Sequence, residues 1–526
     1  MVGLVGAHSA LPSEFHEALQ VARANCARLT EECPPLAEVR PFSPQAYNAI
    51  SAPILRSLYG CIEEISKAPA PPFYSNLALI YHNELHTKLC RHYFREYERI
   101  NGFSDSSQEQ ARRLVRRKIT RRSVTNRVSK AASDIQFNVL NHKRRAALHA
   151  AYLGSATFPW HHLRPHLRSR GISLGPLSGE SFLRIPSSAE QMRLIRGWLE
   201  DLDSELQKTL IRDGSDWRPF DIDDVGVDLE HLCAQPFLST KDCDVLLTGA
   251  LSPAGRAIAL AAQTNGVRVA ILYHGSHYLV YEEPFQALYE GAIPDAMIAY
   301  GAIDKIEPLG CVGPAMNLCG RPIRYYSRPD PLISKIYRPG PIEASASLHG
   351  KKILYLAVEF ENARYGPFRD VHPQTYLNWQ KELLRWLEES AGIRPLVRLH
   401  PKRASTRYDP SPYQGLDRDM QSALKAADVF VIDYPTTTLA YAAATKKPVL
   451  FFDLGIRRLH PAAAEAIRKR CHHASTDILD SSDGLRRMQE DLSRPCNDTF
   501  TPLFSVPSSG TGELESVCDA VCDILS

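Results

Sequence analysis

The chain has 526 residues, of which 44% are hydrophobic, and its formal net charge is only +3. This amount of apolar material exceeds the needs of one core, so the composition predicts a globular enzyme with two large domains and an extra segment. The small net charge argues against a dedicated nucleic-acid-binding protein, whose surface would be strongly basic. The 12 cysteines contain no C-x-x-C pair, which favours reduced, mostly buried thiols over a zinc site.

The first residues, MVGLVGAHSALPSEF, have neither a basic flank nor a sustained apolar core. No run of about 18 or more apolar residues occurs anywhere in the sequence. We therefore expect neither a secretory signal nor a membrane-spanning helix, and a cytoplasmic location.

Residues 1–145 differ from the rest of the chain because they are rich in histidine, arginine and helix-forming residues, which predicts a helical accessory region. Basic residues concentrate between Arg112 and Lys130, with more at Lys143 to Arg145. This run predicts either contact with an anionic membrane surface or lipid-linked phosphate, peripherally on the inner face of the membrane, or a solvated helix face balanced by acids elsewhere. Both interpretations stay open on the sequence.

Residues 146–345 are predicted to form a first Rossmann-like unit. After a short apolar segment, AALHAAYLGSATFPW, the sequence indicates a buried strand at Val245–Thr248, a helix that ends at Gly266, and a second strand in VRVAILYHG. A strand, helix and strand within about 30 residues are typical of a parallel crossover unit, and PDAMIAYG adds one more strand. The proline-rich passage from Pro322 to Pro341 is interpreted as an interdomain linker.

Residues 346–526 are predicted to form a second Rossmann-like unit. Strands KKILYLAV, PLVRLHP, DVFVID and KPVLFFD alternate with helices TYLNWQKELLRWLEES, DMQSALKAA and TTLAYAAAT. Alternation this regular predicts a doubly wound parallel sheet. The expected fold is therefore α/β, with two Rossmann-like domains facing a cleft after an N-terminal helical accessory region.

The first candidate site segment follows the predicted strand PLVRLHP. In an open α/β sheet, ligands bind beyond the carboxyl ends of the strands, where helix N-termini attract phosphate. His400 lies at such an end and Pro401 terminates the strand, while Lys402 adds positive charge. An imidazole in this position can donate a hydrogen bond to a phosphate oxygen or protonate a leaving phosphate.

The second candidate segment runs from Asp433 to Thr438, between the strand DVFVID and the next helix. The hydroxyls of Thr436, Thr437 and Thr438, together with backbone amides, would form an anion cradle. Thr436 alone is explained equally well as an ordinary helix N-cap. Asp433 and Tyr434 are further candidates for groups that line the cleft.

The third candidate segment is His274-Gly275-Ser276, at the end of the strand VRVAILYHG. Gly275 allows a sharp turn that would leave His274 facing the cleft as a general base, with Ser276 beside it, although a histidine after a strand can also be purely structural. Glu359 and Glu361, after the strand KKILYLAV, would either contact a donor hydroxyl or lie in a solvated loop.

Together these segments resemble a known pattern. His274-Gly275, Leu399-His400-Pro401, Asp428 with the segment Asp433 to Thr437, and Lys447-Pro448-Val449 look like motifs of the GT-B superfamily. The nearest branch contains CDP-glycerol glycerophosphotransferases and the CMP-sugar transferases of surface polysaccharides, of the Kdo and sialic acid type. The likeness covers roughly residues 240–455.

The resemblance implies roles for individual residues. His400 and the hydroxyls of Thr436, Thr437 and Thr438 would bind the donor phosphate, and His274 would face the reaction centre. The sequence also departs from the pattern, since many relatives have Ser-Ser where this chain has Pro435-Thr436-Thr437. Tyr441 stands where other GT-B enzymes carry an acidic ribose-binding residue.

The resulting hypothesis is a metal-independent glycosyltransferase without a cofactor. It would move a sugar or polyol phosphate from a CMP- or CDP-linked donor to a glycan or lipid-linked acceptor in capsule or lipopolysaccharide synthesis. Hydroxyls, helix amides and a cationic histidine can neutralise the leaving phosphate without a metal. The alternatives are a sugar-nucleotide epimerase of the same fold, which would need several carboxylates around the sugar, and a non-catalytic membrane-associated scaffold.

Overall fold

The computed structural model describes the main part of both predicted units. The described ranges are 52–60, 148–152, 162–176, 243–249, 266–273, 278–281, 293–309, 321–344, 350–357, 373–389, 392–398, 419–455, 459–479, 481–505 and 512–526, with isolated positions between them. Most of the predicted accessory region, including Arg112 to Lys130, lies outside the described residues.

In the part of the chain that the structure describes, the first sheet has six parallel strands in the order β2-β1-β3-β4-β5-β6. The bounds are β1 Leu148–Tyr152, β2 Ile172–Pro176, β3 Val245–Thr248, β4 Arg268–Leu272, β5 Ala296–Tyr300 and β6 Arg324–Arg328. The residues of β3 and β5 are buried throughout, as expected of parallel strands that are covered on both faces. The strand predicted at Val245–Thr248 is confirmed at those bounds.

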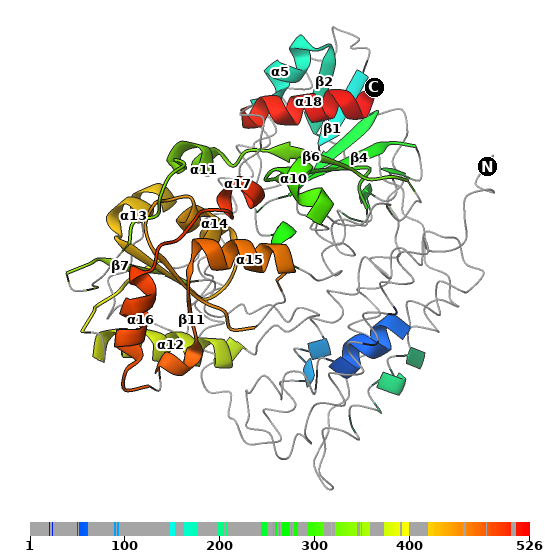
Figure 1. Ribbon diagram of the computed structural model, residues 1–526. Helices are drawn as coiled ribbons and strands as arrows, with labels where there is room; N and C mark the ends of the chain where they lie inside the picture. The colour runs from blue at the N-terminus through cyan, green and yellow to red at the C-terminus, as the bar shows by residue number, and fades with distance from the viewer. Residues whose placement is uncertain are drawn as a thin grey trace, which may run out of the picture.

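Among the described residues of the second unit, the sheet has five parallel strands in the order β11-β10-β9-β7-β8. They are β7 Ile353–Leu356, β8 Leu396–Arg398, β9 Val429–Ile432, β10 Val449–Phe452 and β11 His472–Ala474. Every residue of β7, β9 and β10 is buried, which explains why these strands appear in the sequence as short continuous apolar runs. The prediction of two Rossmann-like α/β units with parallel sheets is confirmed. Figure 1 shows the two units, the first in cyan and green and the second mainly in yellow and orange.

The helices alternate with these strands along the chain. Within the described residues of the first unit, the helices are α5 Leu163–Ser169, α10 Ile303–Ile306 and α11 Pro331–Ile336. From the second unit onward they are α12 Pro373–Glu389, α13 Met420–Ala426, α14 Thr437–Ala443, α15 Pro461–Arg470, α16 Gly484–Ser493, α17 Thr501–Phe504 and α18 Glu513–Leu525. Short 3-10 turns occur at Tyr278–Val280, Glu307–Leu309 and Thr476–Leu479.

The interpretation of Pro322 to Pro341 as a linker is wrong for much of that passage. Strand β6 occupies Arg324–Arg328 and pairs with β5, and α11 follows at Pro331. The sequence hid this strand because it lies at the edge of the sheet and most of its residues are only partly buried, so it lacks an apolar run. Pro331 is compatible with this structure, since it occupies the first turn of α11, where proline is tolerated.

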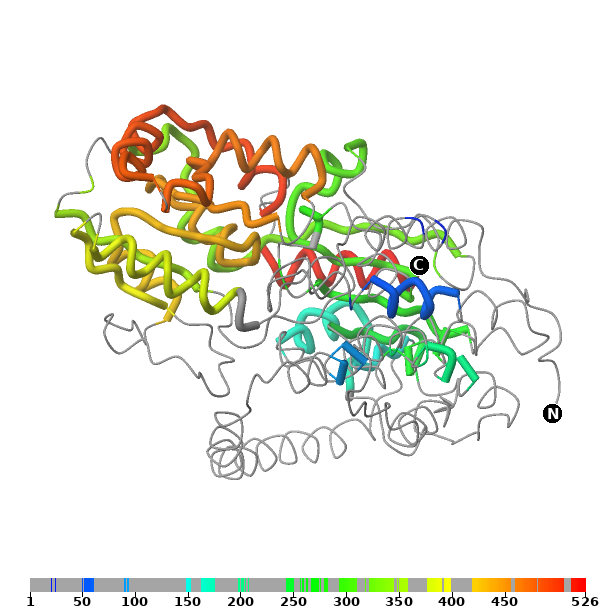
Figure 2. Tube along the Cα trace, turned by 90° about the horizontal axis from the view of Figure 1, so that it is seen from below, coloured from blue at the N-terminus to red at the C-terminus, as the bar shows by residue number. Residues whose placement is uncertain are grey.

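The C-terminal helix α18 belongs with the first sheet rather than the second. Its apolar residues Val517, Val521 and Ile524 pack with Leu247 and Leu272 in one core cluster. Figure 1 shows α18, in red, beside α5 and β2, and Figure 2 shows it again among the strands of the first unit. The predicted extent of the second domain, 346–526, therefore does not match the packing at its C-terminal end. The amphipathic pattern of a helix shows that it has an apolar face, but does not show which sheet covers that face.

Helix α17 also returns to the first unit, and a glycine allows its close approach. Ala302 donates a backbone hydrogen bond to the Leu503 carbonyl at 2.8 Å. Gly301, with φ of +107°, lies so close that an added Cβ would be only 2.7 Å from that same carbonyl oxygen. A side chain at position 301 would therefore push α17 away from the end of β5.

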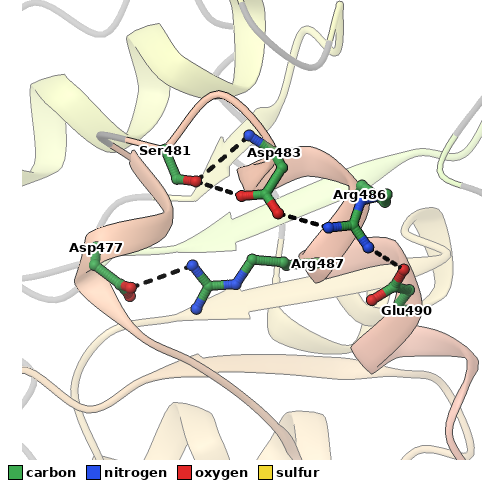
Figure 3. Close-up of polar contacts among 6 residues, drawn as sticks. All are labelled: Asp477, Ser481, Asp483, Arg486, Arg487 and Glu490. Atoms are coloured by element: carbon green, nitrogen blue, oxygen red, sulfur yellow. Dashed lines mark hydrogen bonds and ion pairs between the residues drawn. The ribbon is translucent and has the colours of Figure 1, made fainter.

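An exposed network of charged side chains surrounds the start of α16 (Figure 3). Arg486 contacts Asp483 and Glu490, each at 2.6 Å, and Arg487 contacts Asp477 at 3.2 Å. Because exposed ion pairs gain little over their interactions with water, we expect this network to contribute little to stability. Its arginines therefore provide control positions for substitutions of buried arginines.

Candidate functional site

The second sheet has a topological switch point next to β7. The chain passes from β7 to β8 on one side of it, whereas β9 lies on its other side. Ligands of open α/β sheets bind at the carboxyl ends of the strands at such a point. The turn from β9 to α14, which contains the predicted threonines, begins there and lies within the described residues. The sequence position of the threonine turn and the topology of the sheet therefore both place the candidate site at the carboxyl ends of β7 and β9.

Thr436 is the N-cap of α14. Its hydroxyl accepts a hydrogen bond from the Thr438 amide at 3.3 Å and lies 2.7 Å from the Thr438 hydroxyl. The three side chains from Thr436 to Thr438 are partly exposed, whereas Pro435 is buried. The ordinary N-cap explanation thus holds for Thr436, and the Thr438 hydroxyl lies next to it at the start of the helix. The predicted phosphate-binding role of the three threonines stays a prediction.

Asp433 lies beneath this turn rather than in an open cleft, since only 1% of the residue is exposed. Its carboxylate accepts hydrogen bonds from the Tyr355 hydroxyl at 2.5 Å, the Tyr376 hydroxyl at 2.8 Å and the Trp379 indole at 3.2 Å. These donors come from β7 and α12, so Asp433 fixes the end of β9 against both elements. In this structure the cleft candidate Asp433 has an internal, structural position. Tyr434, the next candidate, is half-buried in the same turn.

Burial dominates the titration of Asp433. Desolvation raises the pKa of its carboxyl group to about 6, although the bonds from Tyr355, Tyr376 and Trp379 favour the charged form. The folded state therefore binds a proton more tightly than the unfolded state does, where the pKa is near 3.8. Stabilisation by this protonation is present below about pH 4 and is lost as the pH rises through about 6.

We expect the free energy of unfolding of the wild type to fall, relative to that of Asp433→Asn, as the pH rises from about 4.5 to 7. A difference of about two pKa units corresponds to a change of at most about 3 kcal/mol. Urea denaturation at several pH values measures it. Asp419→Asn is the matched control, because the hydroxyl and amide of Ser422 lower the pKa of Asp419. Its contribution to stability therefore changes only below about pH 4, with the opposite sign, and we expect almost no change between about pH 4.5 and 7. If the stability difference between the wild type and Asp433→Asn did not change with pH, the raised pKa of Asp433 in the folded state would be contradicted.

In the first sheet, the end of β4 is held by Arg328 of β6. The Arg328 guanidinium donates to the carbonyl of Tyr273, the residue directly before His274. It also pairs with Glu513 of α18 at 3.1 Å and lies 4.0 Å from the centre of the Tyr300 ring. Only 2% of Arg328 is exposed. A buried charge therefore fixes the strand end from which the predicted catalytic turn leaves.

Several predicted site residues lie outside the described residues, so their roles stay predictions. They are His274, Ser276, Glu359, Glu361, His400 and Lys402. Gly275 is described and buried. The strand ends before three of these segments are described, at Leu272 of β4, Leu356 of β7 and Arg398 of β8.

The structure also shows a polar contact that the sequence interpretation missed. Tyr441, on α14, donates to the Asp330 carboxylate at 3.2 Å, and Asp330 caps α11 by accepting from the amides of Leu332 and Ile333. The Asp330-Pro331 pair is a recognisable helix start and could have been predicted from the sequence. The contact with Tyr441 could not, because it joins residues 111 positions apart.

The described part of the chain offers few metal ligands in one place. Among these residues, no group of three or more His, Cys, Asp and Glu side chains could hold a metal ion. The sulfur of Cys496 lies 3.5 Å from Nε2 of His472, which makes only a pair. No described helix is both long and apolar enough to cross a bilayer.

Many solved structures share weak similarity with this chain, and two of them serve as examples. MurG of Acinetobacter baumannii is 12% identical, with a TM-score of 0.33 over 72% of this chain and 99% of its own. The UDP-GlcNAc 2-epimerase of Methanocaldococcus jannaschii, in complex with UDP-GlcNAc and UDP, is 11% identical, with a TM-score of 0.36 over 71% of this chain and 99% of its own. Such scores do not define the fold, which is given by the two sheets described above.

The match to a family model is more informative. No curated protein matches the chain. Residues 248–469, however, match the model of the LIC12162 family of transferases. The matched region runs from the end of β3 to the last turn of α15, and it contains all three candidate segments together with Arg328 and Tyr441.

Proposed function

We propose that this chain is a GT-B glycosyltransferase that uses a nucleotide-activated donor. The observation that carries the proposal is the transferase match over residues 248–469, which spans turns at the carboxyl ends of both sheets. A donor phosphate would lie at the turn from β9 to α14, next to the switch point of the second sheet. The acceptor would approach from the end of β4 in the first sheet.

The proposed chemistry is group transfer by positioning and charge neutralisation. His400 and the hydroxyls of Thr436 to Thr438 would stabilise the leaving phosphate, and His274 would act as general base toward the acceptor hydroxyl. The proposal includes no metal ion and no cofactor, because hydroxyls, backbone amides and an imidazolium can carry the phosphate charge.

The finer parts of the proposal rest on the sequence resemblance. They are a CMP- or CDP-linked donor and a glycan or lipid-linked acceptor in surface polysaccharide synthesis. The further proposal, a cytoplasmic protein that binds the inner face of the membrane, rests instead on the run of basic residues from Arg112 to Lys130. A thermal-shift panel with CMP, CDP, UDP, GDP and TDP tests the donor class, because a ligand that binds only the folded state raises its apparent stability. We expect CMP or CDP to raise the melting temperature. Stabilisation by UDP or GDP alone would contradict the cytidine preference, and no shift with any nucleotide would contradict the donor proposal.

Thr438→Val tests the phosphate-binding turn, because it removes one hydroxyl and keeps the side-chain volume. We expect the nucleotide Kd to rise by about tenfold or more, as for the loss of a hydrogen bond to a charged group. Isothermal titration calorimetry measures this change. Thr445→Val is the matched control beyond the other end of the same helix, where the hydroxyl donates to the Ala442 carbonyl at 2.7 Å. Equal Kd values for the Thr438 variant and the wild type would remove this hydroxyl from the site.

A further inference from the structure

The described segment Tyr278–Tyr281, which comes after β4 in the chain, makes contacts with the second unit. After the 3-10 turn Tyr278–Val280, Tyr281 forms an isolated antiparallel bridge with Leu459. The amide of His460 donates to the Val280 carbonyl at 2.8 Å. His460 also caps α15, since its Nδ1 accepts from the Ala462 amide at 3.2 Å. The short segment is thereby attached to the start of a helix of the second unit.

The side chain of Tyr281 makes a second connection, directly to the threonine turn. Its hydroxyl donates to the carbonyl of Pro435 at 2.5 Å, and only 7% of the residue is exposed. Pro435 immediately precedes the N-cap Thr436, and its ring fixes the backbone angle φ. A rigid, buried carbonyl at the start of the threonine turn therefore accepts a bond from a residue seven positions after His274.

We propose that Tyr281 is a positioning residue, whose bond to Pro435 sets the distance between the chain that leaves β4 and the threonine turn across the two units. This inference rests on the proposed function, since it assigns these two segments to the acceptor side and the donor side of one reaction. In such a reaction the acceptor base and the donor phosphate must be held in one geometry, and a small displacement lowers the rate strongly. In this proposal Tyr281 is not a catalytic residue, and it acts by positioning the predicted base His274.

Tyr281→Phe removes the hydroxyl and keeps the ring that packs in the core. We expect kcat to fall about tenfold while the nucleotide Kd changes less than about twofold, because a positioning residue acts mainly in the transition state. Tyr326→Phe is the matched control, because its hydroxyl bonds Asp523 of α18 rather than the second unit. We expect the control to keep the wild-type kcat.

A double-mutant cycle separates positioning from a general loss of structure. If Tyr281 acts through His274, Tyr281→Phe should cost almost nothing further in a His274→Ala background, because residues that act as a unit are strongly non-additive. An equal fractional loss of kcat in both backgrounds would overturn the inference, and so would a wild-type kcat in Tyr281→Phe.

Hydrogen exchange gives a readout that does not depend on transfer activity. The amide of His460, bonded to Val280, should exchange roughly fivefold faster in Tyr281→Phe than in the wild type, since the segment Tyr278–Tyr281 has lost a neighbouring hydrogen bond. Unchanged exchange at His460 would overturn the inference whether or not the chain is a transferase. If exchange is faster in the variant but the wild type binds no nucleotide, the connection between the units stands and only the proposed function is overturned.

Discussion

Arg328→Met is expected to lower the free energy of unfolding by about 3–5 kcal/mol, because removing one partner of a buried ion pair leaves the other charge buried. Burial already raises the pKa of Glu513, the partner of Arg328, and the arginine counteracts this effect. The substitution also removes the donor to the Tyr273 carbonyl and the contact with the Tyr300 ring. Urea denaturation measures the loss of stability.

The same substitution should lower turnover by more than the loss of folded protein explains, because Tyr273 leads directly into His274. Arg486→Met in the exposed network is the control, and we expect it to change stability by less than about 1 kcal/mol. Arg328→Met combined with Glu513→Leu removes both charges and should recover part of the stability without recovering turnover, since the guanidinium that donates to the Tyr273 carbonyl is still missing. If the double variant regained full turnover, the contact of Arg328 with the Tyr273 carbonyl would have no role in the reaction.

His274→Ala and His400→Ala are expected to fail in different ways. His274→Ala should lower kcat about 100-fold or more, as for the loss of a general base, with the nucleotide Kd nearly unchanged. His400→Ala should raise the nucleotide Kd at least about tenfold, because it removes a donor to a charged phosphate. Both positions fall outside the bounds of the buried strands, so we expect both variants to fold.

Titration calorimetry and single-turnover kinetics on both variants separate binding from chemistry. Complete loss of nucleotide affinity in His274→Ala would show that the division of roles between the two histidines is wrong. Wild-type kcat in that variant would leave His274 as a residue that only closes the strand β4. Unchanged affinity and turnover in His400→Ala would remove His400 from the site.

The central strands of both sheets could be predicted from the sequence because they are buried on both faces. Each of these strands is a short apolar run bounded by polar or turn residues, so its length and its continuous apolar pattern are enough to predict it. The clearest examples are Val245–Thr248, Val429–Ile432 and Val449–Phe452. The edge strand β6 was missed because partial burial leaves polar residues along it. The sequence pattern therefore predicts strands that are fully buried and misses a strand that is only partly buried.

The candidate site could be predicted only as far as single segments allow. The threonine turn could be placed at a strand end, because a strand, a turn and a helix follow one another in the sequence. The buried position of Asp433, where it accepts hydrogen bonds from Tyr355 and Tyr376, could not be predicted. An acidic residue after a strand has the same sequence signature whether it faces a ligand or the core. Nor does any local pattern identify Tyr281 or Arg328, whose partners lie 154 and 185 positions away.

The position of α18 has a consequence for how the protein is made. The apolar face of the first sheet that α18 covers is built from strands that begin at residue 148, yet its cover is formed by residues 513–525. During synthesis from the N-terminus, the ribosome must therefore translate the chain as far as residue 525 before this face can be buried. The second sheet, by contrast, has all its strands available by residue 474. The unit that is translated first thus completes its core last, and exposed apolar surface on the nascent chain is a substrate for chaperones throughout that interval.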